Sequence, residues 1–487
     1  MARKTHDRKS VALHWRRTKI IVTLGPASDS RDMIERLIAA GVDLVRLNMS
    51  HGDADTHRRT VRRVRRAARQ AGRHVAILMD LSGPKIRVGR FEGGRIELQT
   101  GERVTITTRR VSGRPGLIPS QYRRLHLDVR AGERILLDDG KLELRVERVR
   151  GTEVQCRVIE GGVLSDNKGM NLPASRLSTA ALTDKDRRDV RLGVELGVDF
   201  LALSFVRSAA DVQRLQRYLR RLDADIPVIS KIERPEAVEH IDAIMDVTYG
   251  IMIARGDLGI ELPAEKVPLI QRDLTARARQ KGIPVIVATQ MLESMIHSAR
   301  PTRAEVTDVA GAALLSADAA MLSGETAAGD YPLQAVETMD RILREVEEHQ
   351  WKEGCFAGEA ITDRGAKLHF IRESMAHAAV QLARDLELEA VVVPTHTGTT
   401  ARIVSAHRPL APSVGACADE RICRRMALHW GIVPVQIRRT ERRNWRRICL
   451  QISEQCKLGK PGHDILLVSG FNDDPEKNEP VLKLLHL

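Results

Sequence analysis

Short apolar runs alternate with amphipathic stretches over residues 18–85 and 181–353, and this alternation predicts a barrel of parallel strands. The runs have the length and composition of buried strands, and residues with helical periodicity lie between most of them. Eight parallel strands with crossover helices favour a (β/α)8 TIM barrel over an open sheet. The expected strands are KIIVTLG, DLVRLNMS, VAILMDLSG, VDFLALSFV, PVISKIE, GIMIARGD, PVIVATQML and AAMLSGE.

Residues 86–180, between the third and fourth of these runs, show a different pattern. Stretches such as RIELQTGERVTITT and RILLDDGKLELRVERVR alternate apolar and polar residues and are punctuated by glycine. The Asp-Gly pair at Asp139 is a strong hairpin signal. We therefore predict a small β-barrel lid domain, inserted after the third barrel strand, that excludes water from the catalytic end of the barrel.

Residues 354–487 return to alternating strands and helices. Strands AVVVPT, PSVGAC, VPVQI and DILLVSG, with helices ESMAHAAVQLARDL, TARIVSAH and DERICRRMALHWG, predict a C-terminal three-layer α/β domain. Residues 1–17 form a basic N-terminal extension. We expect this extension and about the last ten residues to be mobile.

The net charge of +14 raises the question of a nucleic-acid partner. Aromatic residues make up only 3% of the chain, so platforms for base stacking are scarce. The densest basic run, RRTVRRVRRAARQ, keeps its apolar residues at helical spacing, which indicates one apolar stripe on a solvated helix. We therefore expect no specific nucleic-acid partner.

The cysteines form no CxxC pair and no zinc-binding spacing, which indicates free thiols in a reducing compartment. The basic start of the chain lacks the apolar segment of a signal peptide, and no run approaches the length of a membrane helix. These features predict a cytoplasmic protein that does not bind membranes.

Charged residues follow two of the predicted strands at the end where a (β/α)8 barrel displays catalytic groups. ISKIERPEAV carries Lys231 and Glu233, and IMIARGDLGIEL carries Arg255 and Asp257. Glu233 and Asp257 offer two hard oxygen ligands for Mg²⁺ or Mn²⁺, and Lys231 adds a positive charge beside them. Two surface salt bridges are the alternative, which the presence of both segments disfavours. The set suits a reaction in which negative charge moves between oxygens.

Eight ordered blocks resemble the pyruvate kinase family, in its bacterial type. The blocks are TKIIVTLGPASDS, VRLNMSHG, DLSGPKIRVG, NKGMNLP, ISKIERPEAV, IARGDLGIEL, ATQMLESMI and MLSGETAAGDYP, and the match runs from about Thr18 to Gly470. The resemblance implies the glycolytic transfer of the phosphoryl group of phosphoenolpyruvate to ADP, giving pyruvate and ATP. The sequence contains no GxxxxGK[ST], so a P-loop does not hold the nucleotide.

The resemblance also implies roles for individual residues. Lys231 and Arg46 would stabilise the transferring group, and Thr289 would contact substrate and help order the water that protonates the enolate. The backbone around Arg255, Gly256 and Asp257 would bind the substrate carboxylate. For Arg87 and Lys168, ordinary surface charges are the alternative. ADP would lie near Pro26, Asn48, Ser50, His51, Arg87 and Lys168.

Many members of this family require K⁺ as well as Mg²⁺. Their K⁺ cage resembles Asn48, Ser50 and Asp80 here, with a threonine in place of Leu81 and a glutamate in place of Lys85. Leu81 has no side-chain oxygen, and Lys85 brings its own positive charge. We therefore predict that K⁺ is not required and that the Lys85 ammonium takes its place. The alternative is that Lys85 points to solvent.

The segment VVPTHTGTTARIV in the C-terminal domain suggests a site for a phosphorylated effector, which the resemblance also implies. Hydroxyl-rich loops that run into a helix can cradle a phosphate, although a simple threonine N-cap is the alternative. Because the loop offers one cradle, a sugar monophosphate or AMP is favoured over a bisphosphate. The resemblance further implies a homotetramer. The effector residues would be Thr395, Thr397, Gly398, Thr399 and Thr400.

Two other functions are open at this point. A Mg²⁺-dependent aldolase or lyase on a barrel would use the same pair of carboxylates, but it would need neither the inserted domain nor the C-terminal domain. A basic nucleic-acid-binding protein would lose affinity steeply with added salt. An assay for ADP-dependent formation of pyruvate separates these functions from the first.

Overall fold

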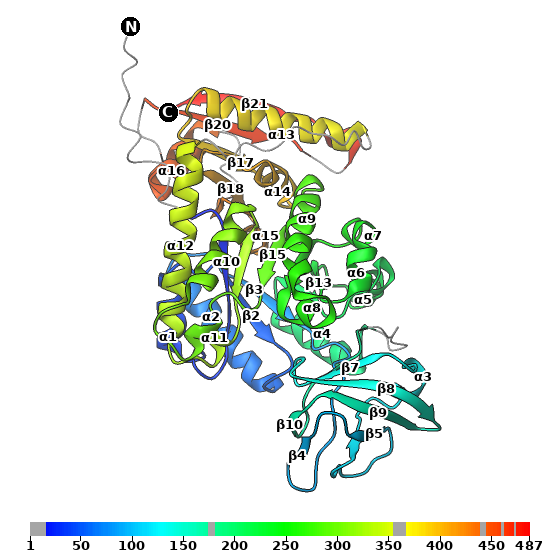
Figure 1. Cartoon of the computed structure of the whole chain (residues 1–487). Helices are drawn as coiled ribbons and strands as arrows, with labels where there is room; N and C mark the ends of the chain where they lie inside the picture. The colour runs from blue at the N-terminus through cyan, green and yellow to red at the C-terminus, as the bar shows by residue number, and fades with distance from the viewer. Residues whose placement is uncertain (1–15, 174–180, 354–366, 439–444, 459–461, 472–473) are drawn as a thin grey trace.

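A computed structural model describes residues 16–173, 181–353, 367–438, 445–458, 462–471 and 474–487. A barrel lies at the centre, with an all-β domain at one end and an α/β domain at the other (Figure 1). The expectations for residues 1–15, for Cys355 and for a domain boundary at residue 354 lie outside the described residues. For Arg16 and Arg17 the expected mobility is wrong, because both are buried and the Arg17 N–H donates to Glu347 Oε2 at 2.8 Å.

The barrel is closed and parallel, as predicted. Strand order is β1-β16-β15-β14-β13-β12-β3-β2, and the pairing of Lys19 with Ala319 joins the first strand to the last. Nearly every residue in these strands is buried because helices cover the outside and side chains fill the inside. The strands are β1 (Lys19–Thr23), β2 (Leu44–Asn48), β3 (Ala76–Asp80), β12 (Phe200–Leu203), β13 (Val228–Ile232), β14 (Gly250–Ala254), β15 (Val285–Ala288) and β16 (Ala319–Leu322).

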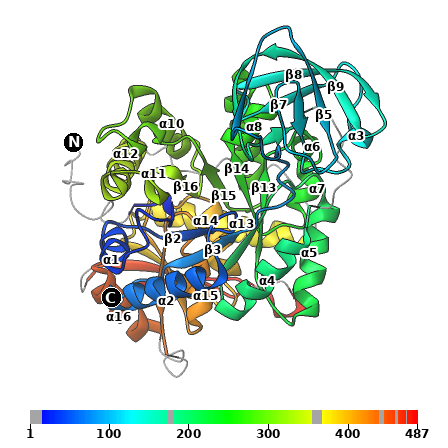
Figure 2. The ribbon, with the colours of Figure 1, turned by 90° about the horizontal axis from the view of Figure 1, so that it is seen from below.

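Helices surround the barrel strands (Figure 2). Amphipathic periodicity places one apolar stripe of each long helix against the strands; in α2, Val61, Val64, Ala67 and Ala68 are buried, as predicted. The helices are α1 (Arg31–Ala39), α2 (Ala54–Gln70), α4 (Asp184–Leu196), α5 (Ala209–Arg221), α6 (Pro235–Glu239), α7 (Ile241–Met245), α8 (Arg255–Glu261), η1 (Ala264–Lys266), α9 (Val267–Gln280), η2 (Glu293–Ile296), α10 (Arg303–Leu314), α11 (Gly324–Ala327) and α12 (Pro332–Glu353).

The inserted domain consists mainly of antiparallel strands, in a six-stranded and a two-stranded sheet with a core of their own. The hairpin predicted at Asp139 joins β7 to β8, and Asp138, Asp139 and Gly140 all have positive φ angles in its turn. The elements are β4 (Arg95–Leu98), β5 (Arg103–Thr107), β6 (Leu117–Pro119), α3 (Leu125–Asp128), β7 (Arg134–Leu137), β8 (Leu142–Arg150), β9 (Glu153–Glu160), β10 (Gly162–Ser165) and β11 (Met170–Asn171).

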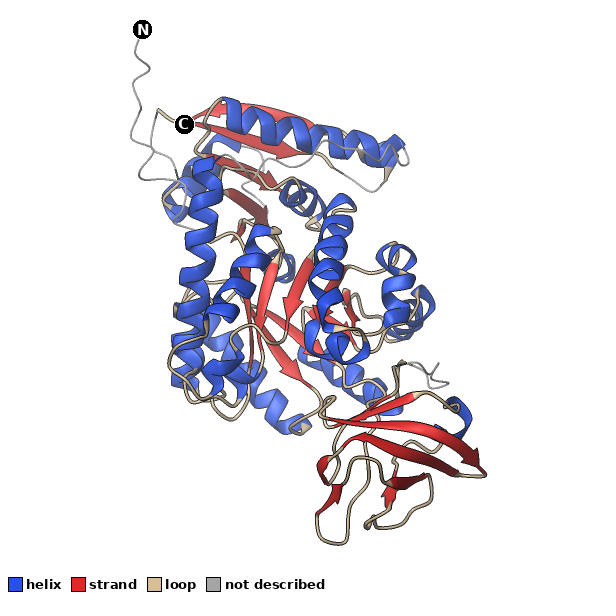
Figure 3. Ribbon diagram, viewed as in Figure 1, coloured by secondary structure: helices blue, strands red, loops and turns tan. Residues whose placement is uncertain are grey.

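The C-terminal domain has a five-stranded sheet in the order β19-β18-β17-β20-β21, with helices packed beside it (Figure 3). An apolar cluster lies on each face of the sheet, as a three-layer α/β domain requires. The elements are α13 (Lys367–Asp385), β17 (Ala390–Pro394), α14 (Thr399–Ala406), β18 (Ser413–Cys417), α15 (Glu420–Met426), β19 (Ile432–Gln436), α16 (Trp445–Cys456), β20 (Asp464–Ser469), η4 (Pro475–Lys477) and β21 (Val481–His486).

Two sequence predictions for this domain were wrong. The end of the chain, expected to be mobile, forms β21, which pairs antiparallel with β20 and buries Leu485 and Leu487. The helix predicted through Trp430 stops at Met426. It stops there because Leu428 turns away and joins the apolar cluster inside the barrel.

The C-terminal domain packs on the end of the barrel where the strands begin. Arg408 Nη2 lies 3.0 Å from Asp318 Oδ2, just before β16, and both residues are buried. Lys19 Nζ, at the start of β1, donates to the carbonyl of Ile432 at 2.7 Å. This packing leaves the opposite end of the barrel to the inserted domain.

None of the described helices combines the length and the apolar composition that crossing a bilayer would require.

Candidate active site

Charged side chains from three strands meet at the end of the barrel where the strands finish. Arg46 on β2 donates from Nε to Asp80 Oδ2 at the end of β3 over 2.7 Å. Lys231 on β13 brings its Nζ to 3.3 Å from the other oxygen of Asp80. Because parallel strands end at the same rim, residues far apart in sequence form one buried group of ion pairs.

Lys231 has an acceptor for each of its three ammonium protons. Besides Asp80, Nζ lies 2.8 Å from Glu233 Oε1 and 2.9 Å from Ser204 Oγ. Burial opposes the charge, but Asp80 and Glu233 outweigh it and raise the pKa of Lys231 above its ordinary value. The lysine therefore carries a full positive charge at neutral pH.

Glu233 and Asp257, the predicted metal ligands, lie near each other. Glu233 is buried, and its Oε2 accepts the Phe205 N–H at 2.8 Å. Burial is the largest cause that raises the pKa of Glu233. The positive charge of Lys231 opposes this rise, and the negative charge of Asp257 adds to it. Two carboxylates that repel each other, one of them buried, form a hard oxygen donor set that suits a divalent cation such as Mg²⁺.

Thr289, Gly256 and Arg255 also come together, at the turn after β15. The Thr289 hydroxyl accepts from the Gly256 N–H at 2.7 Å and donates to the Ala288 carbonyl at 2.6 Å. Thr289 and Gln290 both have left-handed φ angles, of 67° and 53°. The Arg255 guanidinium donates to both of their carbonyls, at 2.9 and 2.7 Å, so its side chain supports this turn.

The predicted nucleotide-binding residues come from two separate places. Pro26, Ser50 and His51 are exposed in the loops after β1 and β2, and the Asn48 Oδ1 accepts the Ser50 N–H at 3.1 Å. The other two belong to the inserted domain: Arg87 donates to the Asn167 carbonyl at 2.8 Å, and Lys168 pairs with Asp138 at 2.8 Å. Their role toward a nucleotide stays a prediction.

The structure does not match the position predicted for the Lys85 ammonium. Lys85 is exposed, as in the alternative interpretation, on the loop that leads into the inserted domain. Asp80 instead pairs with Arg46 and Lys231, two cations that the sequence argument did not place beside it. Leu81 is buried. Asp80 thus has cationic partners without K⁺ and without Lys85.

Sequence reasoning missed several residues at this site. Ser204 and Phe205 directly follow β12, so the rule that placed Lys231 at a strand end could also have found them. Arg234 and Glu261 form a buried ion pair at 2.9 Å, and Asn171 of the inserted domain donates to the same Glu261 oxygen at 3.2 Å. No local pattern links these last three residues, because they meet only through the fold.

Four of the five predicted effector residues, Thr395, Thr397, Thr399 and Thr400, line a cavity of about 180 Å³ at the start of α14. Gly398 is the N-cap, with φ of 89° and no side-chain cap, so the threonine N-cap alternative is wrong. Its N–H donates to Thr395 Oγ1 at 2.9 Å, which shapes the loop. Lys477 from η4 also lines the cavity, and sequence reasoning missed it because η4 is distant in the chain.

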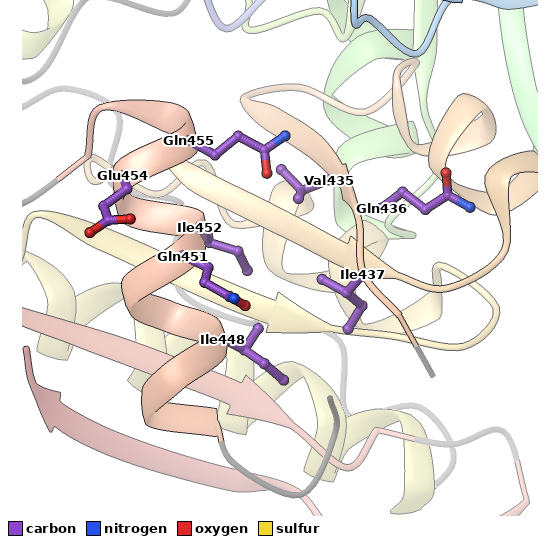
Figure 4. A pocket seen from close by; sticks show the side chains of 8 residues that line it. All are labelled: Val435, Gln436, Ile437, Ile448, Gln451, Ile452, Glu454 and Gln455. Carbon is purple, nitrogen blue, oxygen red and sulfur yellow. The ribbon is translucent and has the colours of Figure 1, made fainter. Parts of the chain in front are cut away.

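A larger cavity of about 500 Å³ lies between β19 and α16 (Figure 4). Isoleucine side chains and glutamine amides line it, and it contains none of the predicted site residues. It lies in the C-terminal domain, at the far end of the molecule from Lys231 and Glu233.

Two family models match the chain. The model described as pyruvate kinase, barrel domain, matches residues 15–336, and the model described as pyruvate kinase, alpha/beta domain, matches residues 373–480. Together they cover the closed barrel with its inserted domain and most of the C-terminal domain.

Individual proteins give the same result. The chain is 45% identical to the pyruvate kinase of Mycobacterium tuberculosis strain H37Rv over 417 residues, which are 85% of this chain and 86% of that protein. It is 44% identical to the pyruvate kinase of Geobacillus stearothermophilus over 420 residues, 86% of this chain and 71% of that one. The crystal structure of a pyruvate kinase from Cryptosporidium parvum matches with a TM-score of 0.88 at 33% identity, covering 97% of this chain and 96% of that chain. This chain therefore belongs to the pyruvate kinase family and transfers the phosphoryl group of phosphoenolpyruvate to ADP, giving pyruvate and ATP.

Proposed function

We propose that Lys231 and Arg46 stabilise the transferring phosphoryl group and that Glu233 and Asp257 hold the metal ion. The observation that carries this proposal is the buried lysine with its carboxylate partners, where Nζ lies 2.8 Å from Glu233 Oε1 and 3.3 Å from Asp80 Oδ1. A structural salt bridge would need only one such partner. Three charged groups at the rim of the barrel suit a reaction that moves negative charge.

Phosphoryl transfer depends on positioning and charge neutralisation more than on covalent help from the protein. The family generally uses a divalent metal ion, and Mg²⁺ or Mn²⁺ held by Glu233 and Asp257 would supply charge neutralisation there. Lys231 would turn one N–H from its present acceptors toward a phosphoryl oxygen. Arg46 would do the same beside it, while Asp80 keeps both cations in place.

The substrate carboxylate would bind to backbone N–H groups around Arg255, Gly256 and Asp257, at the start of α8. The Gly256 N–H now donates to Thr289 Oγ1, so it would exchange this hydroxyl for a substrate oxygen. The freed Thr289 hydroxyl could then contact substrate and help order the water that protonates the enolate.

ADP would bind between the exposed loops after β1 and β2 and the inserted domain. This arrangement uses Pro26, Asn48, Ser50 and His51 from the barrel, and Arg87 and Lys168 from the inserted domain. Closure of the inserted domain would then exclude water from the transferring group. K⁺ would not be required, since Leu81 offers no ligand and Asp80 already has cationic partners.

The cavity at Thr395, Thr397, Gly398, Thr399 and Thr400 would bind a phosphorylated effector, either a sugar monophosphate or AMP. Lys477 supports this assignment because its ammonium, now paired with Asp474 at 2.7 Å, could exchange that carboxylate for a phosphate beside a wall of hydroxyl groups. Titration with these ligands should shift the midpoint or sigmoidicity of the phosphoenolpyruvate saturation curve, and a curve that does not move would refute the assignment. We further propose that the protein is a homotetramer and that it is located in the cytoplasm.

The Lys231→Met variant tests the catalytic assignment. Removing a charge that acts on the transition state commonly costs about 10²–10³ in rate, so kcat should fall by at least this factor. Lys266→Met, which removes an exposed lysine on η1, is the matched control. The midpoint of thermal unfolding shows whether both variants keep the fold. A Lys231→Met enzyme with kcat within twofold of the parent would refute the role of Lys231.

A further inference from the structure

The turn after β12 contacts both members of the Lys231–Glu233 pair. Ser204 Oγ lies 2.9 Å from Lys231 Nζ, and the next N–H, that of Phe205, donates to Glu233 Oε2 at 2.8 Å. Ser204 is buried, and Phe205 has a left-handed φ of 55°. An aromatic residue rarely adopts this conformation, so the surrounding contacts must hold the turn in place.

The direction of the Ser204 hydrogen bonds follows from the distances. A serine hydroxyl has one proton to donate, and the Leu81 carbonyl lies 2.7 Å from Oγ, whereas Asp80 Oδ1 lies 3.4 Å away. The proton therefore goes to Leu81, and the oxygen lone pairs face the ammonium of Lys231. Ser204 thus joins the lysine to the first linker of the inserted domain, which begins after β3.

Gly83, in the same linker, packs directly on this turn. A Cβ at Gly83 would lie 2.7 Å from the Phe205 ring and 3.0 Å from the Ser204 Cβ. The close approach of this glycine leaves the Ser204–Phe205 turn no room to shift toward the linker. The linker, the turn and the lysine therefore form one packed unit.

We infer that Ser204 is a positioning residue, which holds the Lys231 ammonium toward the reacting group and connects its position to the linker of the inserted domain. The inference rests on the role proposed above for Lys231. Ser204 is the only uncharged acceptor among the three groups that the structure places on Lys231 Nζ. Its oxygen can keep one N–H of Lys231 and so fix the direction of the ammonium, while Lys231 turns a different N–H, now donated to a carboxylate, toward a phosphoryl oxygen.

Two substitutions separate the acceptor from the shape of the side chain. Ser204→Ala removes the oxygen, and Ser204→Cys keeps a side chain of similar shape but offers only a weak acceptor. Both should lower kcat by about tenfold to a hundredfold, the loss expected for one hydrogen bond to a charged group. The KM for phosphoenolpyruvate should stay within about twofold, because the oxygen acts where charge develops in the transition state.

Ser208→Ala is the matched control, since that serine lies on the same loop and its hydroxyl caps no helix. Gly83→Ala and Gly94→Ala form a second pair. Both glycines have left-handed φ angles, of 63° and 73°, but an added Cβ meets the Ser204–Phe205 turn only at Gly83. Gly83→Ala should therefore lower kcat, and Gly94→Ala should leave it close to that of the parent.

A Ser204→Cys enzyme with the kcat of the parent would overturn the inference, because shape alone would then suffice. So would a rise in KM with unchanged kcat. Lys231→Met keeps the two proposals apart: if that variant is inactive while Ser204→Cys is fully active, only the inference about Ser204 fails. If Lys231→Met is active, the proposed role of Lys231 fails.

Discussion

At the scale of single residues, a small group of charges explains why the rim of the barrel suits phosphoryl transfer. Arg46, Asp80, Lys231 and Glu233 are largely buried, and each has a partner of opposite charge. Burial of an unpaired charge would cost several kcal/mol, so removing any one of these four side chains would destabilise the charges that remain. A bound substrate or metal ion would exchange with these partners.

Glu233→Gln and Asp257→Asn should raise the concentration of Mg²⁺ needed for half-maximal activity by at least tenfold. Each change replaces a charged ligand with a neutral amide of the same shape. Activity titrations with Mg²⁺ measure the effect. Asp32→Asn, which changes an exposed carboxylate on α1, is the control. An unchanged Mg²⁺ requirement in both ligand variants would contradict the metal assignment.

The parent enzyme should show full activity when a bulky tetraalkylammonium is the only monovalent cation. Leu81 offers no oxygen, and Asp80 is already paired with Arg46 and Lys231. The double variant Leu81→Thr with Lys85→Glu should also stay independent of K⁺, because residue 85 is exposed and Asp80 keeps Arg46 and Lys231 as its partners. Initial rates with and without added K⁺ test both statements. Stimulation of the parent by tenfold or more would show that its activity does depend on K⁺.

Sequence alone predicted Lys231, Glu233 and Asp257 at the strand ends because residue type and position within a strand are local properties. It did not predict what Lys231 contacts, since Ser204 and Asp80 reach it from other strands. The same limit explains Lys85, where the charge was visible in the sequence but the direction of its loop was not.

At the scale of elements, the inserted domain is attached to the barrel by more than its linkers. Asn171 on β11 donates to Glu261 at the end of α8, and Glu261 also pairs with Arg234, which directly follows the proposed metal ligand Glu233. The other oxygen of Glu261 is buried without a hydrogen-bond partner among the described residues. Asn171 and Arg234 therefore decide where this carboxylate lies.

Asn171→Ala should loosen the inserted domain. Loss of this hydrogen bond leaves a buried carboxylate with fewer partners, which costs about 1–3 kcal/mol locally. Amide hydrogen exchange in β11 should become faster, and the KM for ADP should rise. Gln99→Ala, an exposed change in the same domain, is the control. Exchange in β11 at the parental rate would contradict this function of Asn171.

Sequence reasoning was most successful where the local pattern of apolar, polar and turn-forming residues is strong. These elements include all the barrel strands and the Asp139 hairpin. It failed at α15 and β21. Both depend on tertiary contacts, because Leu428 leaves the helical path to enter the barrel and β21 pairs with a strand that precedes it. Neither contact leaves a trace in local periodicity.

At the scale of the whole molecule, the two ends of the barrel differ in what they contact. One end holds the candidate active site, and the other is covered by the C-terminal domain. His429 lies in that covered interface, where it is buried and its Nε2 lies 2.9 Å from the Tyr249 hydroxyl. The contact joins the two domains through uncharged groups.

The stability of this interface should fall below neutral pH. Burial lowers the pKa of His429 from 6.5 to about 3, although Asp318 partly opposes the shift. Between these values the unfolded chain binds a proton that the folded protein does not, so stability decreases as pH falls below 6.5. From pH 7 to pH 5 this one group should remove roughly 2 kcal/mol.

Denaturant midpoints at pH 7 and pH 5 measure this loss in the parent and in His429→Gln. The variant cannot take up the proton, so its loss between the two pH values should be smaller. His486→Gln, which changes an exposed histidine on β21, should behave as the parent does. Equal losses in the parent and in His429→Gln would exclude His429 as a source of acid sensitivity.

The insertion of Leu428 into the barrel also sets an order of events during synthesis. Every strand of the barrel has been synthesised by residue 322, yet the apolar cluster inside the barrel is completed by a residue made more than a hundred positions later. Until then, the end of the barrel where the strands begin lacks its apolar closure. A nascent chain that stops before Leu428 thus carries an open hydrophobic surface, which the C-terminal domain covers only once Leu428 has been made.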